Sequence, residues 1–124
     1  MSLKILLVDD NVDSCELFQL LLERMGHAVE SAHTGNEGLA QLEAGEFDLA
    51  IIDIGLPVLD GLQVAARARE TLGARTPRLV AMTGYVRSED VEASRRAGFD
   101  EHLLKPVEPS LLASVVERAQ TARG

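Results

Sequence analysis

The chain alternates five times between a short apolar run and a longer stretch whose apolar residues have helical spacing. The apolar runs lie at 3–8, 49–52 and 79–82, with weaker candidates at 27–32 and 102–104. Runs this short are typical of strands, and three of them are apolar throughout except for Lys4, which predicts strands buried on both faces of a sheet. The stretches between them predict helices at about 11–25, 35–45, 61–72, 88–98 and from 109 onward.

Residues that favour helix ends flank these stretches. Thr34 and Glu37 have the spacing of a capping box, and Asp60 and Ser88 are suited to cap the next two helices. Pro109 is suited to the first position of the last helix. The expected inward faces are Val12, Cys15, Phe18, Leu22 and Met25 in the first helix, Leu39 and Leu42 in the second, Val91, Ala93 and Ala97 in the fourth, and Leu111, Leu112, Val115, Val116 and Ala119 in the fifth.

Strict alternation of strands and helices predicts crossover connections and a parallel sheet. Five such units fit an open, doubly wound α/β sheet, whereas an eight-fold barrel needs about twice this length. The 124 residues show no linker or low-complexity segment, so we expect one domain over residues 1–124.

Composition excludes several classes of protein. A formal net charge of -8 argues against a nucleic-acid binder, which needs a basic face. The single cysteine, Cys15, excludes an internal disulfide and a cysteine-based zinc site, and its place in the apolar stripe predicts a core residue. No apolar run approaches the ~18 residues of a membrane span, and no leader opens the chain, so a cytoplasmic setting is expected.

In an open parallel sheet, ligands bind beyond the carboxyl ends of the strands. The residues at those positions are Asp9, Asp10, Asp53, Thr83 with Gly84, and Lys105 with Pro106. At ~5 Å and an effective dielectric constant of ~20, each pair of carboxylates repels by roughly 3 kcal/mol. A divalent cation relieves this repulsion, and a small cluster of hard oxygen ligands suits Mg²⁺. Lys105, one of two lysines beside ten arginines, would add a compact positive charge.

Each of these residues also has a plainer interpretation. Asp10 alone is as well suited to cap the following helix as to bind a metal ion. Thr83 alone is typical of a turn hydroxyl, and Lys105 alone of a solvated surface lysine. His33 and His102 have no metal-ligand spacing, and Arg95 with Arg96 reads as a solvated helix face. The coincidence of the strand-end residues at one edge of the sheet favours the functional interpretation.

These motifs resemble the receiver domains of response regulators in two-component signalling. Asp9-Asp10 resembles the family's acidic pair, and the segment from Asp53 to Gly61 resembles its phosphoacceptor segment. Thr83 with Gly84 resembles the switch threonine and its small neighbour, and Lys105-Pro106 the family's lysine and cis-bonded proline. The resemblance covers essentially the whole chain and implies a flavodoxin-like sheet of strand order 2-1-3-4-5.

The resemblance also implies a function. Asp53 would take a phosphoryl group from a phosphohistidine on a histidine kinase or a histidine phosphotransfer protein. Mg²⁺ would be held by Asp10, by Asp9, by Asp53 and by the backbone carbonyl of Gly55. Lys105 and Thr83 would contact the phosphoryl oxygens, which would change the surface of the fourth helix, fifth strand and fifth helix. Such a chain catalyses only its own phosphotransfer and dephosphorylation, contacts no nucleic acid, and is a monomer or a phosphorylation-dependent dimer.

Two positions bear on how this chain would differ within the family. His102 stands three residues before the lysine, where the family usually has a tyrosine or phenylalanine that switches rotamer. Tyr85, two residues after Thr83, would influence the lifetime of the phosphoryl group together with Gly55. The segments 83–85, 97–100 and 102–106 look most like receivers attached to hybrid histidine kinases.

Three alternatives remain at this point. A small phosphatase with Asp53 as nucleophile usually needs a second carboxylate two residues on, where this chain has Gly55. A flavodoxin-like electron carrier needs a hydroxyl-rich phosphate loop, where this chain has Asp9-Asp10-Asn11. A degenerate receiver that only binds partner proteins is disfavoured by the intact acidic set.

Overall fold

The computed structural model describes residues 2–84 and 88–123. Within these residues the chain forms a parallel sheet of five strands in the order β2-β1-β3-β4-β5, covered by five α-helices. The elements are β1 (Lys4–Val8), α1 (Val12–Arg24), β2 (Ala28–Ala32), α2 (Gly35–Ala44), β3 (Leu49–Asp53), α3 (Gly61–Leu72), a 3₁₀ turn (Gly73–Arg75), β4 (Arg78–Thr83), α4 (Ser88–Ala97), β5 (Glu101–Leu104) and α5 (Pro109–Arg123). The predicted doubly wound α/β class and strand order are confirmed.

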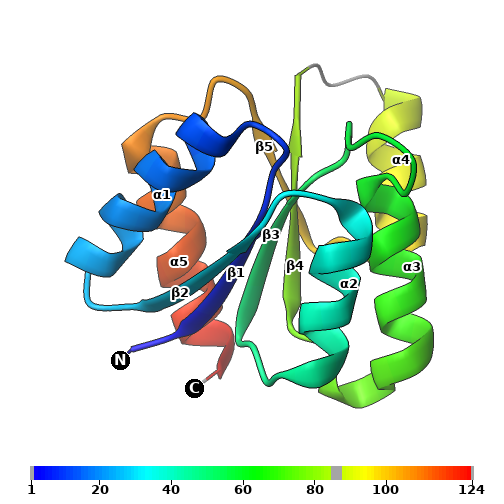
Figure 1. Cartoon of the computed structure of the whole chain (residues 1–124), viewed down its shortest axis with the longest axis horizontal. Coiled ribbons are helices and arrows are strands. Elements are labelled where there is room, and N and C mark those ends of the chain that lie inside the picture. The colour runs from blue at the N-terminus through cyan, green and yellow to red at the C-terminus, as the bar shows by residue number, and fades with distance from the viewer. Residues whose placement is uncertain (1, 85–87, 124) are drawn as a thin grey trace.

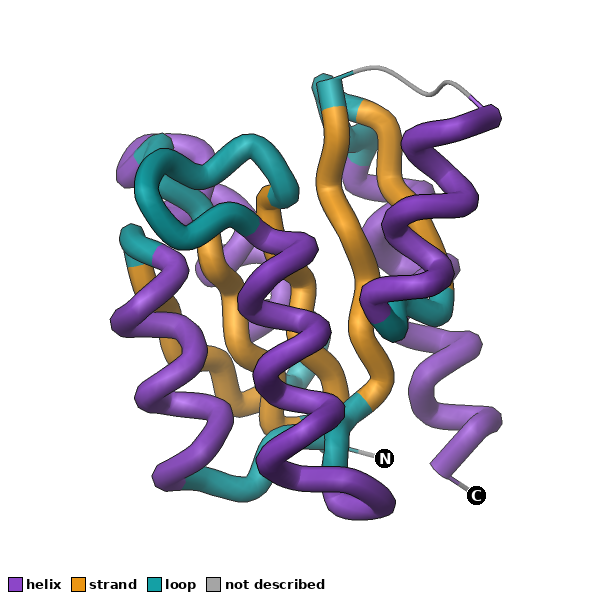
Figure 2. The backbone as a smooth tube through the Cα atoms, turned by 90° about the vertical axis from the view of Figure 1, so that its right-hand side faces the viewer, coloured by secondary structure: helices purple, strands orange, loops and turns teal. Residues whose placement is uncertain are grey.

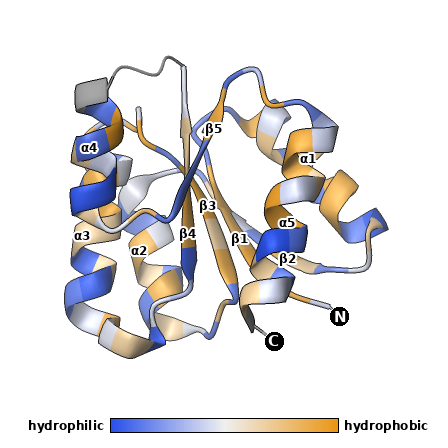
Figure 3. Cartoon of the chain, turned by 180° about the vertical axis from the view of Figure 1, so that it is seen from behind, coloured by the Kyte–Doolittle hydropathy of each residue, from blue (hydrophilic) through white to orange (hydrophobic). Residues whose placement is uncertain are grey.

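The helices lie on both faces of the sheet, with α1 and α5 on one face and α2, α3 and α4 on the other (Figure 1). The side view shows the strands running between these layers (Figure 2), and because all paired strands are parallel, their carboxyl ends lie at the same edge. Two buried apolar clusters result, one under each helical layer. The apolar colouring of β1, β3 and β4 in Figure 3 reflects this burial on both faces.

Helix caps agree partly with the sequence. Asp60 and Gln63 form a full capping box at α3, with hydrogen bonds of 2.9 and 3.0 Å. At α2 the structure gives only the Thr34 half of the expected box, a 3.1 Å bond that Thr34 Oγ1 accepts from Glu37 N. Asn11 caps α1 by accepting a 3.0 Å hydrogen bond from Ser14 N. Ser88, expected as a cap, is already the first residue of α4.

The predicted inward faces are wrong at the ends of two long helices. Val12 and Met25 of the α1 stripe, and Leu111 of α5, are each close to half exposed. The 13 residues of α1 span about 20 Å, whereas the five of β1 span about 16 Å, so the helix ends overhang the sheet. The predicted core residue Cys15 is confirmed as buried, and burial raises the pKa of its thiol to about 11.

The predicted inward face of α4 is also wrong at one position. Ala93 is exposed, whereas its neighbour Ser94 is fully buried. Ser94 lies between Val91 and Ala97, which are both partly buried as expected. An apolar pattern could not identify it, because a serine becomes a core residue only when its hydroxyl has a partner.

One loop residue adopts a strained conformation. Val58, between β3 and α3, has φ 68° and is 96% exposed. The left-handed region costs an L-residue about 1–2 kcal/mol, and more when the residue is β-branched.

Candidate functional site

The predicted strand-end residues meet at the carboxyl edge of the sheet. The sheet register pairs Val8 with Ile52, Asp53 with Met82, and Thr83 with Leu104. Asp9 and Asp10 follow Val8, and Lys105 follows Leu104, so all of them reach the same edge. Carboxylate oxygens of Asp9, Asp10 and Asp53 lie within 4.8 Å of one another. We call Asp9, Asp10, Asp53 and Lys105 the acidic pocket.

Asp53 is held firmly at the end of β3. It is 7% exposed, and each carboxylate oxygen accepts one hydrogen bond. Oδ1 accepts from the backbone N–H of Gly55 at 2.8 Å, and Oδ2 accepts from Lys105 Nζ at 2.8 Å. These two bonds fix the plane of the carboxylate.

Asp9 is the most deeply buried member of the acidic pocket. It is 1% exposed; Oδ1 accepts a 3.0 Å hydrogen bond from Asn11 N, whereas Oδ2 is buried and accepts none. Lys105 Nζ lies 3.7 Å from that oxygen. Burial raises the pKa of Asp9, because the desolvation outweighs the hydrogen bond from Asn11 and the charge of Lys105.

Asp10 is exposed, and Asn11 instead of Asp10 provides the cap of α1. The plainer interpretation of Asp10 as a helix cap is therefore wrong. Its side chain is free to complete the cluster with the two buried carboxylates.

Lys105 contacts two of the three carboxylates. Burial lowers its pKa, but the hydrogen bond and charge of Asp53, with the charges of Asp9 and Asp10, outweigh this, and the net shift is upward. Lys105 thus stays charged at neutral pH. The peptide bond between Lys105 and Pro106 is cis, as the resemblance implies.

Thr83 ends β4 and is 6% exposed. Its carbonyl accepts a 2.7 Å hydrogen bond from Lys105 N, which ties the β4 end to the β5 end. Gly84 is exposed, and a Cβ built on it would have no atom of the described residues within 4 Å. The predicted residue Tyr85 lies outside the described residues.

One glycine on the other side of Asp53, Gly61, is needed for close approach. A Cβ on Gly61 would lie 2.6 Å from the carbonyl oxygen of Asp53 and 2.6 Å from Ile54 Cα. The start of α3 thus packs against the backbone of Asp53 itself. Gly55 is exposed and approaches Asp53 Oδ1.

His102 lies on β5 beside Ala81 of β4, and its half-buried side chain faces α4. Its Nε2 lies 2.6 Å from the hydroxyl of Ser94. Burial, with a smaller contribution from the charge of Arg95, lowers the pKa of His102. Next to it on β5, Glu101 accepts hydrogen bonds from Arg118 of α5 at 2.6 Å and from Arg78 at 2.9 Å. Two neighbouring residues of β5 thus join α4 and α5 to the same strand.

Sequence reasoning missed two contacts around this site. One is the Ser94–His102 bond, and the other is a 3.0 Å contact between His33 Nδ1 and the carbonyl oxygen of Asp9. The sequence marks His33 only as a residue without metal-ligand spacing, and His102 also as the residue at the family's aromatic switch position, with no partner predicted for either. The position of His33 directly after β2, beside the acidic strand end, was the signal that could have found it.

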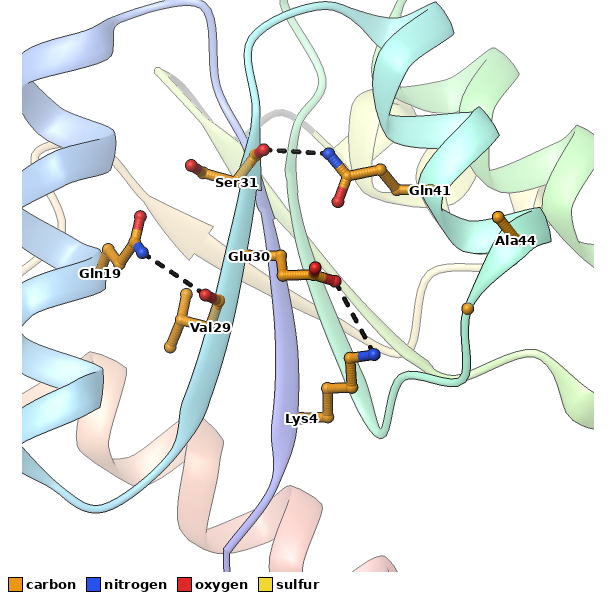
Figure 4. A pocket seen from close by; sticks show the side chains of 8 residues that line it. Lys4, Gln19, Val29, Glu30, Ser31, Gln41 and Ala44 are labelled. Carbon is orange, nitrogen blue, oxygen red and sulfur yellow. Dashed lines mark hydrogen bonds and ion pairs between the residues drawn. The ribbon is translucent and has the colours of Figure 1, made fainter.

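A cavity between α1 and α2 lies apart from the acidic pocket (Figure 4). Gln19 and Gln41 point toward β2 from opposite sides, and their amide groups donate to the carbonyls of Val29 at 3.4 Å and Ser31 at 3.1 Å. Lys4 and Glu30 face each other across the cavity at 3.8 Å. Its polar groups are paired with one another, which argues for a structural role at the edge strand.

The fold and the acidic pocket define a doubly wound α/β domain with a carboxylate cluster at the carboxyl edge of its sheet, and comparison with known proteins gives its family. Residues 5–117 match the family described as the response regulator receiver domain, and the chain belongs to this family. An uncharacterized 14.6 kDa protein of Leptolyngbya boryana is 37% identical over 114 residues, which cover 92% of this chain and 87% of that protein. The sensor histidine kinase GacS of Pseudomonas protegens is 34% identical over 116 residues, 91% of this chain but 13% of the kinase.

Solved structures agree with this assignment. A CheY-like receiver domain protein of Methanospirillum hungatei superposes with a TM-score of 0.87 at 35% identity, covering 98% of both chains. Several curated relatives are longer, and the chain spans about half of one Bacillus subtilis regulator, YclJ, and about a quarter of the regulator ZraR. In the described part of this chain, no helix combines the length and the apolar character that a membrane crossing requires.

Proposed function

We propose that this receiver is a phosphorylation switch in which Asp53 accepts a phosphoryl group from the phosphohistidine of a histidine kinase or histidine phosphotransfer protein. The observation that supports this most directly is the setting of Asp53. It is a buried carboxylate at the end of a central strand, oriented by Gly55 and Lys105 and placed beside two further carboxylates. Phosphoryl transfer depends mainly on such positioning and on charge neutralisation.

In the proposed step, an oxygen of Asp53 forms a bond to phosphorus while the phosphorus–nitrogen bond of the donor breaks. The electron pair of that bond returns to the imidazole nitrogen, and Asp53 becomes an acyl phosphate. Lys105, already 2.8 Å from Asp53 Oδ2, stabilises negative charge on the phosphoryl oxygens. Hydrolysis of the acyl phosphate would be the only other reaction of the domain, which makes it a switch and not a turnover enzyme.

The acidic pocket fits Mg²⁺. The buried Oδ2 of Asp9 lacks a hydrogen bond, and oxygens from three carboxylates lie within 4.8 Å. We assign Asp10, Asp9, Asp53 and the carbonyl of Gly55 as the groups that would hold the ion. When bound, Mg²⁺ supplies the charge neutralisation that three clustered carboxylates and an incoming phosphoryl group require.

We further propose that Thr83 reports phosphorylation to the surface formed by α4, β5 and α5. Its hydroxyl would bind a phosphoryl oxygen, and Gly84, which no other described residue crowds, would let the backbone follow. Because β5 contacts α4 through His102 and α5 through Glu101, a shift at the β4 end would reach both helices. A downstream protein would bind this surface, with no direct contact to nucleic acid and either a monomer or a phosphorylation-dependent dimer as the active form.

The family's phosphohistidine donors suggest a cytoplasmic setting for the switch. The likeness to GacS favours a receiver that works with a sensor kinase, either as part of one chain or as a separate protein. We expect residues 1–124 to fold as one domain in either arrangement. Tyr85 remains a proposed influence on the lifetime of the phosphoryl group.

The test is direct phosphorylation of the purified chain. With Mg²⁺ and acetyl phosphate, or with a phosphorylated histidine phosphotransfer protein, intact-mass measurement should show one added phosphoryl group. Chelation of Mg²⁺ should prevent the addition. A chain that stays unmodified with every competent donor would mean that it acts only by binding partners.

Asp9→Asn should make the fold more stable in the absence of Mg²⁺. The native-state pKa of Asp9 is raised, so its ionised form weakens the fold at neutral pH, and the neutral isostere should add about 1 kcal/mol to the free energy of unfolding. The gain should shrink as the pH falls through that raised pKa, because wild type then takes up the proton. Urea titrations at several pH values, with and without Mg²⁺, measure both effects.

With saturating Mg²⁺, wild type should be more stable than Asp9→Asn. Wild type gains stability from the bound ion, whereas the variant loses a ligand and gains much less. If Asp9→Asn is less stable than wild type without Mg²⁺ at neutral pH, the ionised carboxylate of Asp9 does not destabilise the fold.

Ser94→Ala should loosen α4. Ser94 is fully buried, and loss of its bond to His102 should lower the free energy of unfolding by about 1–2 kcal/mol and reduce hydrogen-exchange protection across α4. Ser114→Ala in α5 is the matched control, because that hydroxyl bonds only the carbonyl of Ser110 on the exposed side. Equal effects of the two substitutions would show that the His102 bond does not hold α4.

A further inference from the structure

Strand β2 is flanked by two histidines, which contact the backbone of the residues just before and just after the neighbouring strand β1. At one end, His27 Nδ1 accepts a hydrogen bond of 3.0 Å from Leu3 N. At the other, His33 Nδ1 lies 3.0 Å from the carbonyl oxygen of Asp9. A carbonyl oxygen only accepts, so Nδ1 of His33 carries the hydrogen and donates it. The two contacts are alike in form, but only the second touches the acidic pocket.

The carbonyl that His33 contacts belongs to the peptide that joins Asp9 to Asp10. The N–H of Asp9 is also bound, donating to the carbonyl of Ala32 at 3.0 Å. The backbone of Asp9 is thus fixed on both sides of its side chain by the end of β2. Of the two contacts, that of His33 restrains the Asp9–Asp10 peptide group, which leads directly into Asp10.

Asp10 depends on this restraint more than the two buried carboxylates do. Asp9 and Asp53 are oriented by hydrogen bonds to Asn11, Gly55 and Lys105. Among the residues that the structure describes, no hydrogen bond reaches the exposed side chain of Asp10. Its position in the cluster therefore follows from the orientation of the peptide before it.

We propose that His33 is a positioning residue for the cation site of the acidic pocket. By holding the Asp9–Asp10 peptide, it keeps Asp10 pointed at the two buried carboxylates before a divalent cation arrives. Groups that orient metal ligands typically contribute 10–100-fold in affinity, and His33 acts through one backbone contact. The inference rests on the proposed function only in taking Mg²⁺ as the ligand.

The experiment is calorimetric titration of Mg²⁺ into the full chain at one fixed pH. His33→Ala should raise the Kd for Mg²⁺ by about 3–10-fold, the effect of losing one hydrogen bond from the supporting shell. His33→Asn should recover most of the affinity, because asparagine places its amide nitrogen where the imidazole has Nδ1. His33→Gln, whose amide reaches the position of Nε2 instead, should not.

His27→Ala is the matched control. It removes the equivalent contact at the opposite end of β2, so it should lower the melting temperature without changing the Kd for Mg²⁺. A Kd that changes equally in the His27 and His33 variants would overturn the proposal, because general loosening of β2 would then explain both. If His33→Ala does not fold, His33→Asn is compared with His33→Gln. A lower Kd for Mg²⁺ in His33→Asn supports the proposal, and equal Kd values overturn it.

Phosphorylation of each variant, measured separately, distinguishes this inference from the proposed function. A wild type that binds Mg²⁺ and is phosphorylated, with an unchanged Kd in His33→Ala, overturns only the role of His33. A changed Kd in a chain that no donor phosphorylates supports His33 and contradicts the phosphoacceptor role. A wild type that binds no Mg²⁺ overturns both.

Discussion

Asp53→Asn is expected to take up no phosphoryl group from any donor. The amide nitrogen has no free electron pair for attack on phosphorus, and the remaining oxygen is a much weaker nucleophile than a carboxylate. The fold should be retained, because the amide oxygen can still accept the hydrogen bond from Gly55 N. Lys105 also keeps one carboxylate partner, since its Nζ lies 3.7 Å from Asp9 Oδ2. Removing one of three clustered negative charges also reduces their repulsion.

Intact-mass measurement after incubation with Mg²⁺ and acetyl phosphate tests this expectation. Asp60→Asn is the matched control, since it replaces another aspartate at the end of the same loop. Asparagine caps helices about as well as aspartate, so this variant should be modified to the same extent as wild type. Equal modification of Asp53→Asn and wild type would place the phosphoacceptor elsewhere.

Gly61→Ala should have the largest effect on stability among the substitutions considered. The new Cβ would lie 2.6 Å from two backbone atoms, the carbonyl oxygen of Asp53 and Ile54 Cα, and backbone cannot move aside as a flexible side chain can. We expect a loss of about 2–3 kcal/mol, or roughly 10 °C in melting temperature for a domain of this size.

Gly84→Ala provides the control on the other side of the pocket. In the described part of the chain no atom lies within 4 Å of a Cβ placed there, so its stability should stay within about 0.5 kcal/mol of wild type. Thermal unfolding of both variants measures the difference. A Gly61→Ala variant as stable as Gly84→Ala would mean that α3 does not pack on the backbone of Asp53.

The sequence was sufficient to predict the sheet and the residues at its carboxyl edge. Continuous apolar runs such as Leu49–Ile52 are short enough to be strands, and the residue after each run has only one edge to occupy. Asp53 and Thr83 are therefore placed by strand length alone, without knowledge of any side-chain contact. The same reasoning does not depend on how the helices are rotated.

Helix rotation was the part that could not be predicted. Successive helical residues differ by about 100° in direction, so exchanging one inward position for its neighbour, as with Ala93 and Ser94, needs knowledge of the facing strand. The partner of Ser94 is His102, which lies eight residues later on another element. Contacts of this kind, and that of His33 with the Asp9 carbonyl, depend on the relative placement of elements and leave no periodic pattern in the sequence.

The buried cysteine makes the chain its own reporter of unfolding. Cys15 is 1% exposed, and its thiol pKa of about 11 leaves almost no thiolate at neutral pH, so a thiol reagent can react only when α1 separates from the sheet. As the single cysteine, it gives one labelling rate for the whole chain. Measured on the purified chain before and after phosphorylation, that rate would compare the stability of the two forms.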